Sequence, residues 1–427
     1  MSISTGLPVP RRANETINLG EQRGRMRIAS KEVDNITVSV SVHMLPRPRV
    51  FIEGRVAGSS FSILTDLKDH ADADFTFHGN KAKTPIVIAH ASEGDDFAFS
   101  AWPQKEVIDY GQRESVTSIQ GAILNFYAAY EIGNSATRKI LLEGETWAIG
   151  FTPQPDMVAI VDQLNKEGGY GVTHFFEIKR TNSEAITASS AADILEALKL
   201  FLSFARGANC GLGLVKGCSA ANTPLWQQWG FSQTSRWSST VNWFFSPQGQ
   251  FLRGAFPGFM REWQNGGREH IRSAIEMYAE ANRDEPDVKP SLMLAQSALE
   301  LLSWLSMVRG SCLSADGFRA LPAADHIRLL LHQCRIPSLI PHTLADLTRA
   351  AASQKLDGPG MLTEVRNALV HPGKSRKNMT ANVYVEAWSL SMWYFELAIL
   401  HRFGYDGSHV NRLLDPPALQ QVPWHAS

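Results

Sequence analysis

The sequence is poor in cysteine and has almost no net charge. Only four cysteines occur among its 427 residues, which is too few for a disulfide framework, so we expect a protein of the reducing cytoplasm. Lysine and arginine number 41 against 42 aspartates and glutamates, for a formal net charge of -1. This balance argues against a surface that is basic overall and binds nucleic acid everywhere, but it is compatible with a local basic patch.

Long apolar runs are also missing. The first residues, MSISTGLPVPRRANET, contain no apolar core of a signal peptide. We find no stretch of 18 or more apolar residues and therefore expect no contact with a membrane. Hydrophobic residues still make up 44% of the chain and charged residues 19%. This composition supports sizeable hydrophobic cores and argues against a disordered chain.

The first half of the chain has the pattern of short β-strands. Apolar and polar residues alternate along ITVSVSVHML in the two-residue period of a half-buried strand. Similar apolar runs follow, separated by turn signals: VFIEGRV, PIVIAHA, AILNFYAAYEI, KILLEGETWAIGFT, MVAIVDQL and THFFEIKR. The pair Gly168-Gly169 predicts a hairpin between the last two runs. A helix is expected in AADILEALKLFLSFA, with Ser190 as its cap and Gly207 at its end.

After about residue 265 the pattern changes to that of helices. In PSLMLAQSALELLSWLSMV, Leu292, Ala295, Leu299 and Leu302 recur at helical spacing. Other helices are expected in REHIRSAIEMYAEAN, AADHIRLLLHQC, HTLADLTRAAASQ, GMLTEVRNALVH and the segment 379–403. The loops between them hold most of the glycine and proline, as in an all-α bundle.

These patterns predict an α+β protein with a β-rich N-terminal domain followed by a helical bundle. The expected parts are a flexible arm at 1–20, the β-rich domain at 21–262, the bundle at 263–415 and a loose tail at 416–427. The β-rich domain would act as a sensor, an inhibitor or a scaffold. Four tryptophans gather within it, which favours core packing over base stacking or binding of another protein: Trp226, Trp229, Trp237 and Trp243.

The segment GMLTEVRNALVHPGKSRKN carries the pattern most suggestive of chemistry. It contains Arg366, the adjacent Asn367 and His371, with four residues between the arginine and the histidine. Pro372 disfavours helical geometry at the preceding residue, so we expect the helix to end at His371. On a regular helix the side chains of Arg366 and His371 would point about 140° apart, and the break could reduce that divergence.

This pair of side chains suits cleavage of RNA, which carries its own nucleophile, the 2′-hydroxyl. A histidine that titrates near neutrality can move the proton, and a guanidinium can hold two phosphate oxygens while charge develops on them. Such chemistry needs no metal and no cofactor. Lys374, Arg376 and Lys377 follow directly and could bind flanking phosphates as a local basic patch.

The spacing alone is a weak signal, because other arginine–histidine pairs occur at similar intervals: Arg319 with His326, Arg335 with His342, and Arg402 with His409. Each of these has proline or glycine in the interval. Only Arg366 and His371 share an unbroken helical interval on the second-to-last helix of the expected bundle.

That combination resembles the HEPN superfamily of ribonucleases. The sequence motif RNALVHPGK, together with QSALELL on an earlier helix, is similar to the HEPN domains of ApeA-like bacterial antiphage proteins. In those proteins a β-rich region precedes the bundle. The similarity covers the C-terminal third by motif and the N-terminal half by architecture alone. It implies a metal-independent endoribonuclease, a homodimer or larger assembly that pairs two motifs, and phage-triggered growth arrest (abortive infection). A phage protein as trigger and transfer RNA among the substrates would fit this role.

The resemblance also implies roles for individual residues. Arg366 and His371 would be catalytic, and Asn367 would support them. An acidic or polar residue on an earlier helix often assists such a pair, and Glu300 is the candidate because it lies one step off the apolar stripe of its helix.

Three other interpretations stay open. Arg366 could be a surface residue, His371 a helix cap and Glu300 a solvated carboxylate. The bundle could also be a non-catalytic module that binds a phage protein or a nucleotide. Finally, Asp156, Glu177 and Lys179 have the layout of a metal-dependent PD-(D/E)xK nuclease, in which two carboxylates hold a divalent ion and a lysine orients water.

Overall fold

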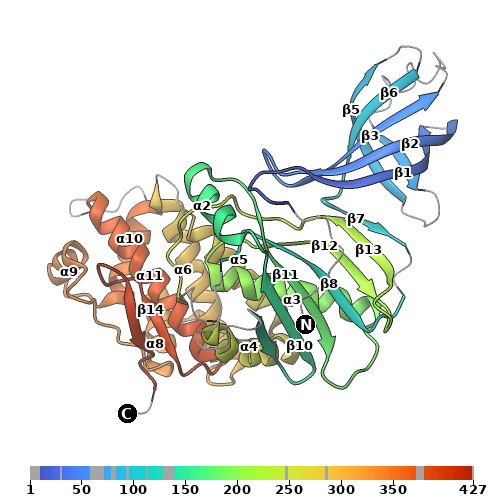
Figure 1. Cartoon of the computed structure of the whole chain (residues 1–427). Helices are drawn as coiled ribbons and strands as arrows, with labels where there is room; N and C mark the ends of the chain where they lie inside the picture. Colours follow the sequence, from blue (N-terminus) through green and yellow to red (C-terminus); the bar gives the residue numbers. More distant parts are fainter. Residues whose placement is uncertain are drawn as a thin grey trace.

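The computed structural model describes residues 10–28, 31–57, 72–77, 83–92, 96–111, 114–127, 139–245, 249–283, 287–371 and 379–425. Along the chain it contains a closed β-barrel, a seven-stranded sheet with two helices, and a helical bundle followed by a two-stranded ribbon (Figure 1). The expected order of a β-rich first half and a helical second half is confirmed.

The barrel is built from the first six strands: β1 (Ile17–Ile28), β2 (Lys31–His43), β3 (Arg49–Ala57), β4 (Asp72–Phe77), β5 (Lys83–Ser92) and β6 (Asp96–Pro103). The strands pair antiparallel in the order β1-β2-β3-β6-β5-β4, and β1 pairs with β4 to close the barrel. The predicted alternation is observed on β2, where Ile36, Val38, Val40 and Val42 are all fully buried. Closure pairs each of these strands on both sides, which protects them from pairing with other chains.

The second unit is an antiparallel sheet in the order β7-β13-β12-β8-β11-β10-β9. Its elements are β7 (Val107–Tyr110), β8 (Ser118–Leu124), β9 (Ile140–Glu143), β10 (Trp147–Pro153), α2 (Met157–Glu167), β11 (Val172–Arg180), α3 (Ala188–Arg206), β12 (Gly211–Cys218) and β13 (Pro224–Gly230). On β8, Ile123 packs in one core cluster with Phe201 of α3. Its neighbours Ala122 and Leu124 point the other way and share a cluster with Val50 of the barrel. The sheet is therefore covered on both faces.

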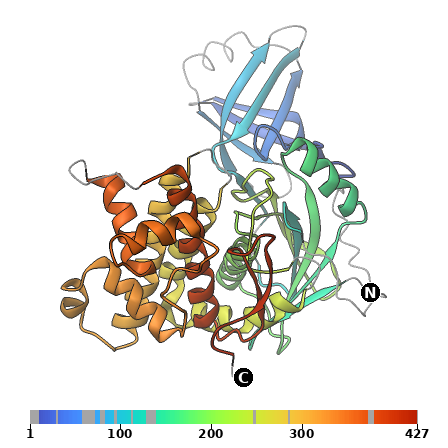
Figure 2. The ribbon, with the colours of Figure 1, turned by 90° about the vertical axis from the view of Figure 1, so that its left-hand side faces the viewer.

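The bundle follows, with these elements: α4 (Gln250–Glu262), η1 (Trp263–Gly267), α5 (Arg268–Ala281), α6 (Val288–Trp304), η2 (Leu305–Arg309), α7 (Ala315–Arg319), α8 (Ala323–Gln333), α9 (Ala345–Ala352), α10 (Gly358–Val370), α11 (Ala381–Arg402), β14 (Ser408–Asn411) and β15 (Ala418–Gln421). Every residue from Leu390 to Leu400 on α11 is buried. A helix that is apolar on all sides lies at the centre of its fold, and the other helices surround α11 (Figure 2).

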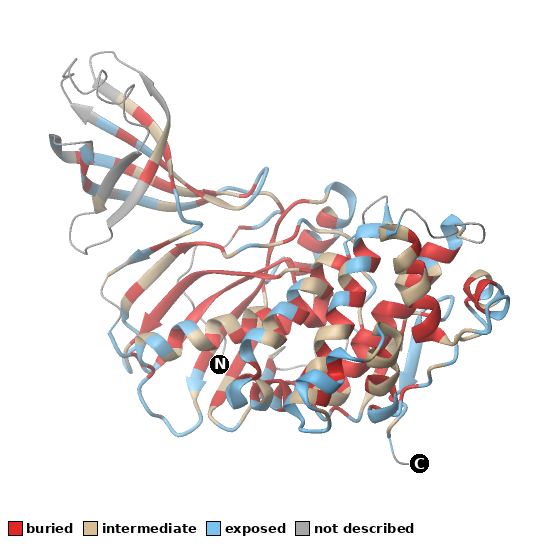
Figure 3. Cartoon of the chain, turned by 180° about the vertical axis from the view of Figure 1, so that it is seen from behind, coloured by how far each residue is buried: buried red, intermediate tan, exposed pale blue. Residues whose placement is uncertain are grey.

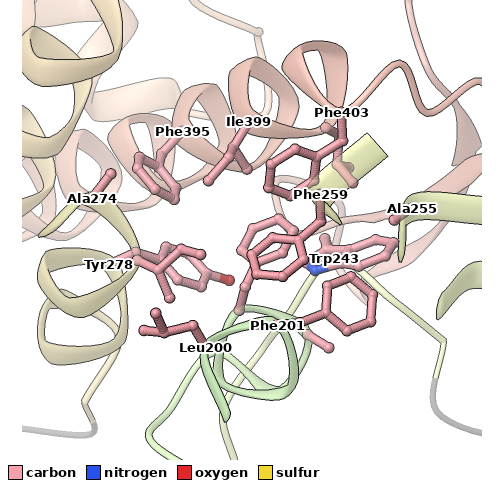
Figure 4. Close-up of a cluster of buried hydrophobic side chains, with 14 of the residues drawn as sticks. Leu200, Phe201, Trp243, Ala255, Phe259, Ala274, Tyr278, Phe395, Ile399 and Phe403 are labelled. Atoms are coloured by element: carbon pink, nitrogen blue, oxygen red, sulfur yellow. The ribbon is translucent and has the colours of Figure 1, made fainter. Parts of the chain in front are cut away.

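The sheet and the bundle share one hydrophobic core. Figure 4 shows aromatic side chains of α3, α4, α5 and α11 meeting around Trp243 of the connecting segment. Phe201 of α3 lies 5.3 Å from Phe259 of α4, measured between ring centroids, and Tyr278 of α5 stacks on Phe395 of α11 at 4.9 Å. Buried residues accordingly run from the sheet into the bundle without a break at residue 263 (Figure 3).

One expected strand is a helix. The run MVAIVDQL forms most of α2, whose buried residues Met157, Ile160, Val161 and Leu164 have helical spacing. The prediction of a hairpin at Gly168-Gly169 was therefore wrong, because a short apolar run does not distinguish a strand from a buried helix by its composition. Both glycines instead adopt positive φ values, 68° and 97°, where α2 turns into β11.

The two ends of the chain also differ from expectation. Within the arm expected at 1–20, residues 10–20 are held in place: Asn14 binds the backbone of Tyr170 in both directions, and β1 begins at Ile17. The tail expected to be loose contains β15, which pairs with β14, and the indole of Trp424 donates to the Tyr405 carbonyl. Tertiary contacts order both segments, although their sequences resemble those of loose termini.

Helix α6 and its continuation η2 form an apolar segment, Val288–Arg309, that is long enough to cross a membrane. More than half of its most apolar window is buried. The segment packs against α5, α8 and α11. We therefore interpret it as a core helix of the bundle, and the described chain is consistent with a soluble protein.

The ribbon β14–β15 holds a histidine whose burial predicts a sensitivity to acid. His409 is 1% exposed, and neither ring nitrogen has a partner in good hydrogen-bond geometry among the described residues. Burial lowers the pKa of His409 from 6.5 to about 4, against a weaker opposing interaction with the backbone of Gln420. The unfolded chain then binds this proton more readily than the folded protein does.

We expect this burial to stabilise the protein fully above about pH 6.5 and to stop doing so as the pH falls through the window from 6.5 to about 4. The loss should approach about 3 kcal/mol at the lower end. Urea unfolding at pH 7.5, 6 and 5 measures it, with His409→Leu beside the unchanged protein. The variant should lose less stability on acidification. An identical pH dependence in both proteins would contradict this assignment.

Candidate active site at the end of helix α10

Helix α10 begins at a well-anchored N-terminus. The carboxylate of Asp357 accepts the backbone N–H of Gly360 and pairs in bidentate geometry with Arg328 of α8, at 2.7 and 2.8 Å. Burial alone would raise the pKa of Asp357, but the hydrogen bonds from Arg328 and Gly360 lower it below its usual range. This cap fixes the start of the helix and hence the position of its other end.

The buried face of α10 orients the predicted catalytic residues. Met361, Leu362 and Val365 are fully buried in the bundle core, while Arg366 and Asn367 are half-buried. The helix ends at Val370, as the proline at 372 predicted. His371 follows in an extended conformation, with φ -111° and ψ 110°, and is exposed.

The side chains of Arg366 and His371 are available to a ligand. Within the described part of the chain, neither makes a side-chain hydrogen bond or an ion pair. The backbone N–H of His371 still donates to the Asn367 carbonyl at 3.0 Å, so His371 starts from a helical position. The two side chains therefore leave the helix about 140° apart. The break at His371 does not bring them together within one copy of the chain.

Glu300 lies toward the opposite end of α10. On α6, Ser303 donates to the backbone of His326 on α8 at 2.9 Å, one helical turn from Glu300. Arg328, two residues further on α8, holds Asp357 at the start of α10. His371 comes 13 residues after the first residue of α10, which is about 20 Å along the helix axis.

A second contact, between the starts of α6 and α11, agrees with this placement of α6. Lys289, at the start of α6, lies over the ring of Tyr384 at the start of α11, the helix that follows α10 in the chain. These contacts place Glu300 away from Arg366 and His371 within one copy, and its assisting role stays a prediction. Sequence spacing could not show this placement, because it depends on the direction in which α6 packs against α10.

The predicted phosphate-binding residues Lys374, Arg376 and Lys377 lie outside the described residues. Their placement stays a prediction.

The sequence did not indicate that one polar residue of the bundle, Gln296, would be buried. Gln296 on α6 is fully buried, and neither atom of its side-chain amide has a hydrogen-bond partner among the described residues. An unpartnered buried amide costs about 1–3 kcal/mol. Its place in the run QSALELL, next to the exposed Ser297, gave no sequence signal of this burial.

The residues proposed for a metal site do not meet. Glu177 and Lys179 lie on β11 and pair with each other at 3.0 Å. Asp156 caps α2, beyond the pairing of Pro153 with His174. At about 3.4 Å per residue, Glu177 is at least about 10 Å along the strand from that point. A search of the described residues also finds no group of three acidic, histidine or cysteine side chains able to hold a metal ion.

The tryptophan cluster is mainly structural. Trp226, Trp229 and Trp243 are at most 6% exposed and belong to core clusters, which confirms the core prediction for these three. Trp237 is partly exposed and lies under the guanidinium of Arg206, at 5.1 Å from the ring centroid.

Comparison with known proteins finds similarity to one group. A family model described as the YopA central domain matches residues 111–240, and one described as the YopA C-terminal domain matches residues 264–421. These segments correspond to most of the sheet with α2 and α3, and to the bundle with its ribbon. The SPbeta prophage-derived uncharacterized protein YopA of Bacillus subtilis (strain 168) is 23% identical over 405 residues, which cover 90% of each chain. No solved structure matches.

Proposed function

We propose that the protein is a metal-independent endoribonuclease of the HEPN kind. The observation that carries the proposal is the presence of two groups near the end of the capped helix α10: the guanidinium of Arg366, which has no partner among the described residues, and the exposed imidazole of His371. An arginine in a structural role normally pairs with a carboxylate, as Arg328 does at the other end of the same helix. Arg366 pairs with no carboxylate in the part of the chain that the structure describes, and we propose that it binds an anion instead.

The reaction that fits this pair is attack of the RNA 2′-hydroxyl on the adjacent phosphorus. His371 accepts the hydroxyl proton, and the new P–O bond forms as the bond to the 5′-oxygen of the next nucleotide breaks. The leaving oxygen takes a proton from an imidazolium or from water, and the products carry a 2′,3′-cyclic phosphate and a 5′-hydroxyl. Arg366 stabilises the negative charge on the phosphate oxygens in the transition state.

The divergence of the two side chains favours a site made by two copies of the chain. On regular helical geometry Arg366 and His371 would leave α10 about 140° apart, so a site shared by two copies is a direct way to bring an arginine and a histidine to one phosphate. A homodimer with a two-fold axis near the ends of two α10 helices would place the arginine of one copy opposite the histidine of the other. Asn367, also half-buried at this end, would orient the phosphate or the partner helix. Growth arrest in the cytoplasm after phage infection is the biological role that we attach to this activity.

The second candidate is a non-catalytic module that binds RNA or a protein through the same end of α10. It is favoured by the absence, among the described residues, of any hydrogen bond or ion pair between Glu300 and Arg366 or His371. The two candidates differ in whether RNA is cut.

The deciding experiment incubates the purified protein with labelled single-stranded RNA in excess EDTA. We expect cleavage at an undiminished rate and products that end in a 2′,3′-cyclic phosphate, detected by their resistance to a phosphatase until acid opens the ring. Glu177→Gln serves as the control for the metal alternative and should cut normally. RNA that is bound but left intact would favour the binding module, and loss of cleavage in EDTA would overturn the proposed mechanism.

A further inference from the structure

A cavity of about 330 Å³ lies between helix α3 and the sheet, far along the chain from the α10 motif. Its walls come from α3, β7 and β12 and from the region of β13: Val107, Ala192, Leu195, Glu196, Lys199, Leu212, Gly213, Val215, Gln228 and Ser232. This volume is in the range of small-molecule sites, and most of the lining is apolar.

Strand β12 is distorted beside the cavity. The pairing of β12 with β8 shifts register between Gly213 and Lys216, and Leu214 has a φ of 51° in the left-handed region. A non-glycine residue is strained in this conformation. The distortion turns Leu214 toward the barrel, while Leu212 and Val215 both face the core on the side of α3.

The distortion also opens the sheet between β12 and β13. The two strands pair at Lys216 with Gln227, and they meet again only at the isolated bridge between Gly213 and Phe231. Between these points Gln228 lines the hollow. A β-bulge beside a hollow is a common feature of binding sites, where it redirects side chains at the expense of ladder hydrogen bonds.

The polar groups of the cavity are suited to an anion. Glu196 is already neutralised by Arg272 of α5, at 2.7 Å. Lys199 is half-buried in the wall, and its ammonium makes no hydrogen bond or ion pair within the described part of the chain. The hydroxyl oxygen of Ser232 accepts the backbone N–H of Leu212, which leaves the hydroxyl hydrogen free to donate.

We propose that this cavity binds a small amphiphilic anion. Its apolar body would lie between α3 and β12, against Leu195, Leu212 and Val215, and its acidic head group would pair with Lys199. Carboxylate and phosphate head groups share this chemistry, and the experiment below distinguishes them. The site does not depend on ribonuclease activity.

The test is calorimetric titration of the full chain with decanoate, decyl phosphate and the neutral decanol, each below its micelle concentration. Decanoate or decyl phosphate should bind about tenfold more tightly than decanol, because the charged contact to Lys199 adds to the same apolar burial. The tighter of the two anions identifies the head group. Lys199→Met should reduce the affinity for the anion to that for decanol.

Two further variants separate the cavity from its surroundings. Ala192→Trp fills the hollow from an exposed position on α3, so it should abolish binding of all three probes while the thermal unfolding midpoint stays unchanged. Lys166→Met removes an exposed lysine on α2 outside the cavity and should bind normally. Absence of binding to the unchanged protein at millimolar probe, or binding that Lys199→Met and Ala192→Trp leave intact, overturns the proposal.

Discussion

Replacing Arg412 with methionine is expected to lower the free energy of unfolding by about 3–5 kcal/mol. The Arg412 side chain is 3% exposed and pairs with the fully buried carboxylate of Glu396 at 2.6 and 3.1 Å. It also donates to Asn282 and to the Val241 carbonyl, and Tyr278 donates to Glu396 at 2.6 Å. The substitution leaves the carboxylate of Glu396 buried without a counter-charge, and this unpaired buried charge accounts for most of the expected destabilisation.

The shifted pKa values agree with this view of the network. Burial alone would lower the pKa of Arg412, but the attraction of Glu396 raises it above its usual range. Burial, followed by the repulsion of Glu396, raises the pKa of Tyr278 well above 10. Tyr278 therefore stays neutral and Arg412 stays charged at neutral pH.

Urea unfolding followed by circular dichroism measures the effect. Arg283→Met is the matched control, because Arg283 pairs with Glu280 at the exposed surface, where a pair contributes about 0–1 kcal/mol. The double variant Glu396→Gln with Arg412→Met should recover much of the loss, since no charge is then left buried. If Arg412→Met cost no more than Arg283→Met, the buried pair would not hold the fold together.

The network explains why the end of the chain is ordered. Arg412 follows β14 directly and reaches α5, α11 and the segment before Trp243. It therefore attaches the ribbon to the helices that form the shared core of sheet and bundle. The expectation of a loose tail did not include these contacts, because Arg412 bonds to residues 16 and 171 positions away in the sequence, which no local pattern reveals.

Local patterns predicted elements well and contacts poorly. The alternation on β2 and the helical periodicity of α6 depend on neighbouring residues, and the structure has both elements. The end of α10 before the proline at 372 follows from a local steric rule in the same way. The helix α2 was mistaken for a strand because its apolar run is short. The position of Glu300 and the distorted β12 depend on packing between distant segments, which no local pattern encodes.

His371→Ala is expected to reduce RNA cleavage by about 10²–10⁴-fold, the usual contribution of a general acid or base. Arg366→Ala should reduce it by about 10²–10³-fold, as expected for loss of one group that stabilises the transition-state charge. Neither side chain has a partner among the described residues at this end of α10. We therefore expect each substitution to change the free energy of unfolding by no more than about 0.5 kcal/mol. The measurement is the initial rate on labelled RNA.

Matched controls come from exposed residues of the same types elsewhere in the bundle. His342→Ala and Arg319→Ala should leave the rate unchanged, because neither residue lies on α10. A mixture of Arg366→Ala and His371→Ala subunits adds a test of the two-copy site. If the arginine of one copy serves the histidine of the other, mixed dimers contain one intact site and recover part of the activity that each variant alone has lost. A mixture as inactive as its components would contradict the two-copy site.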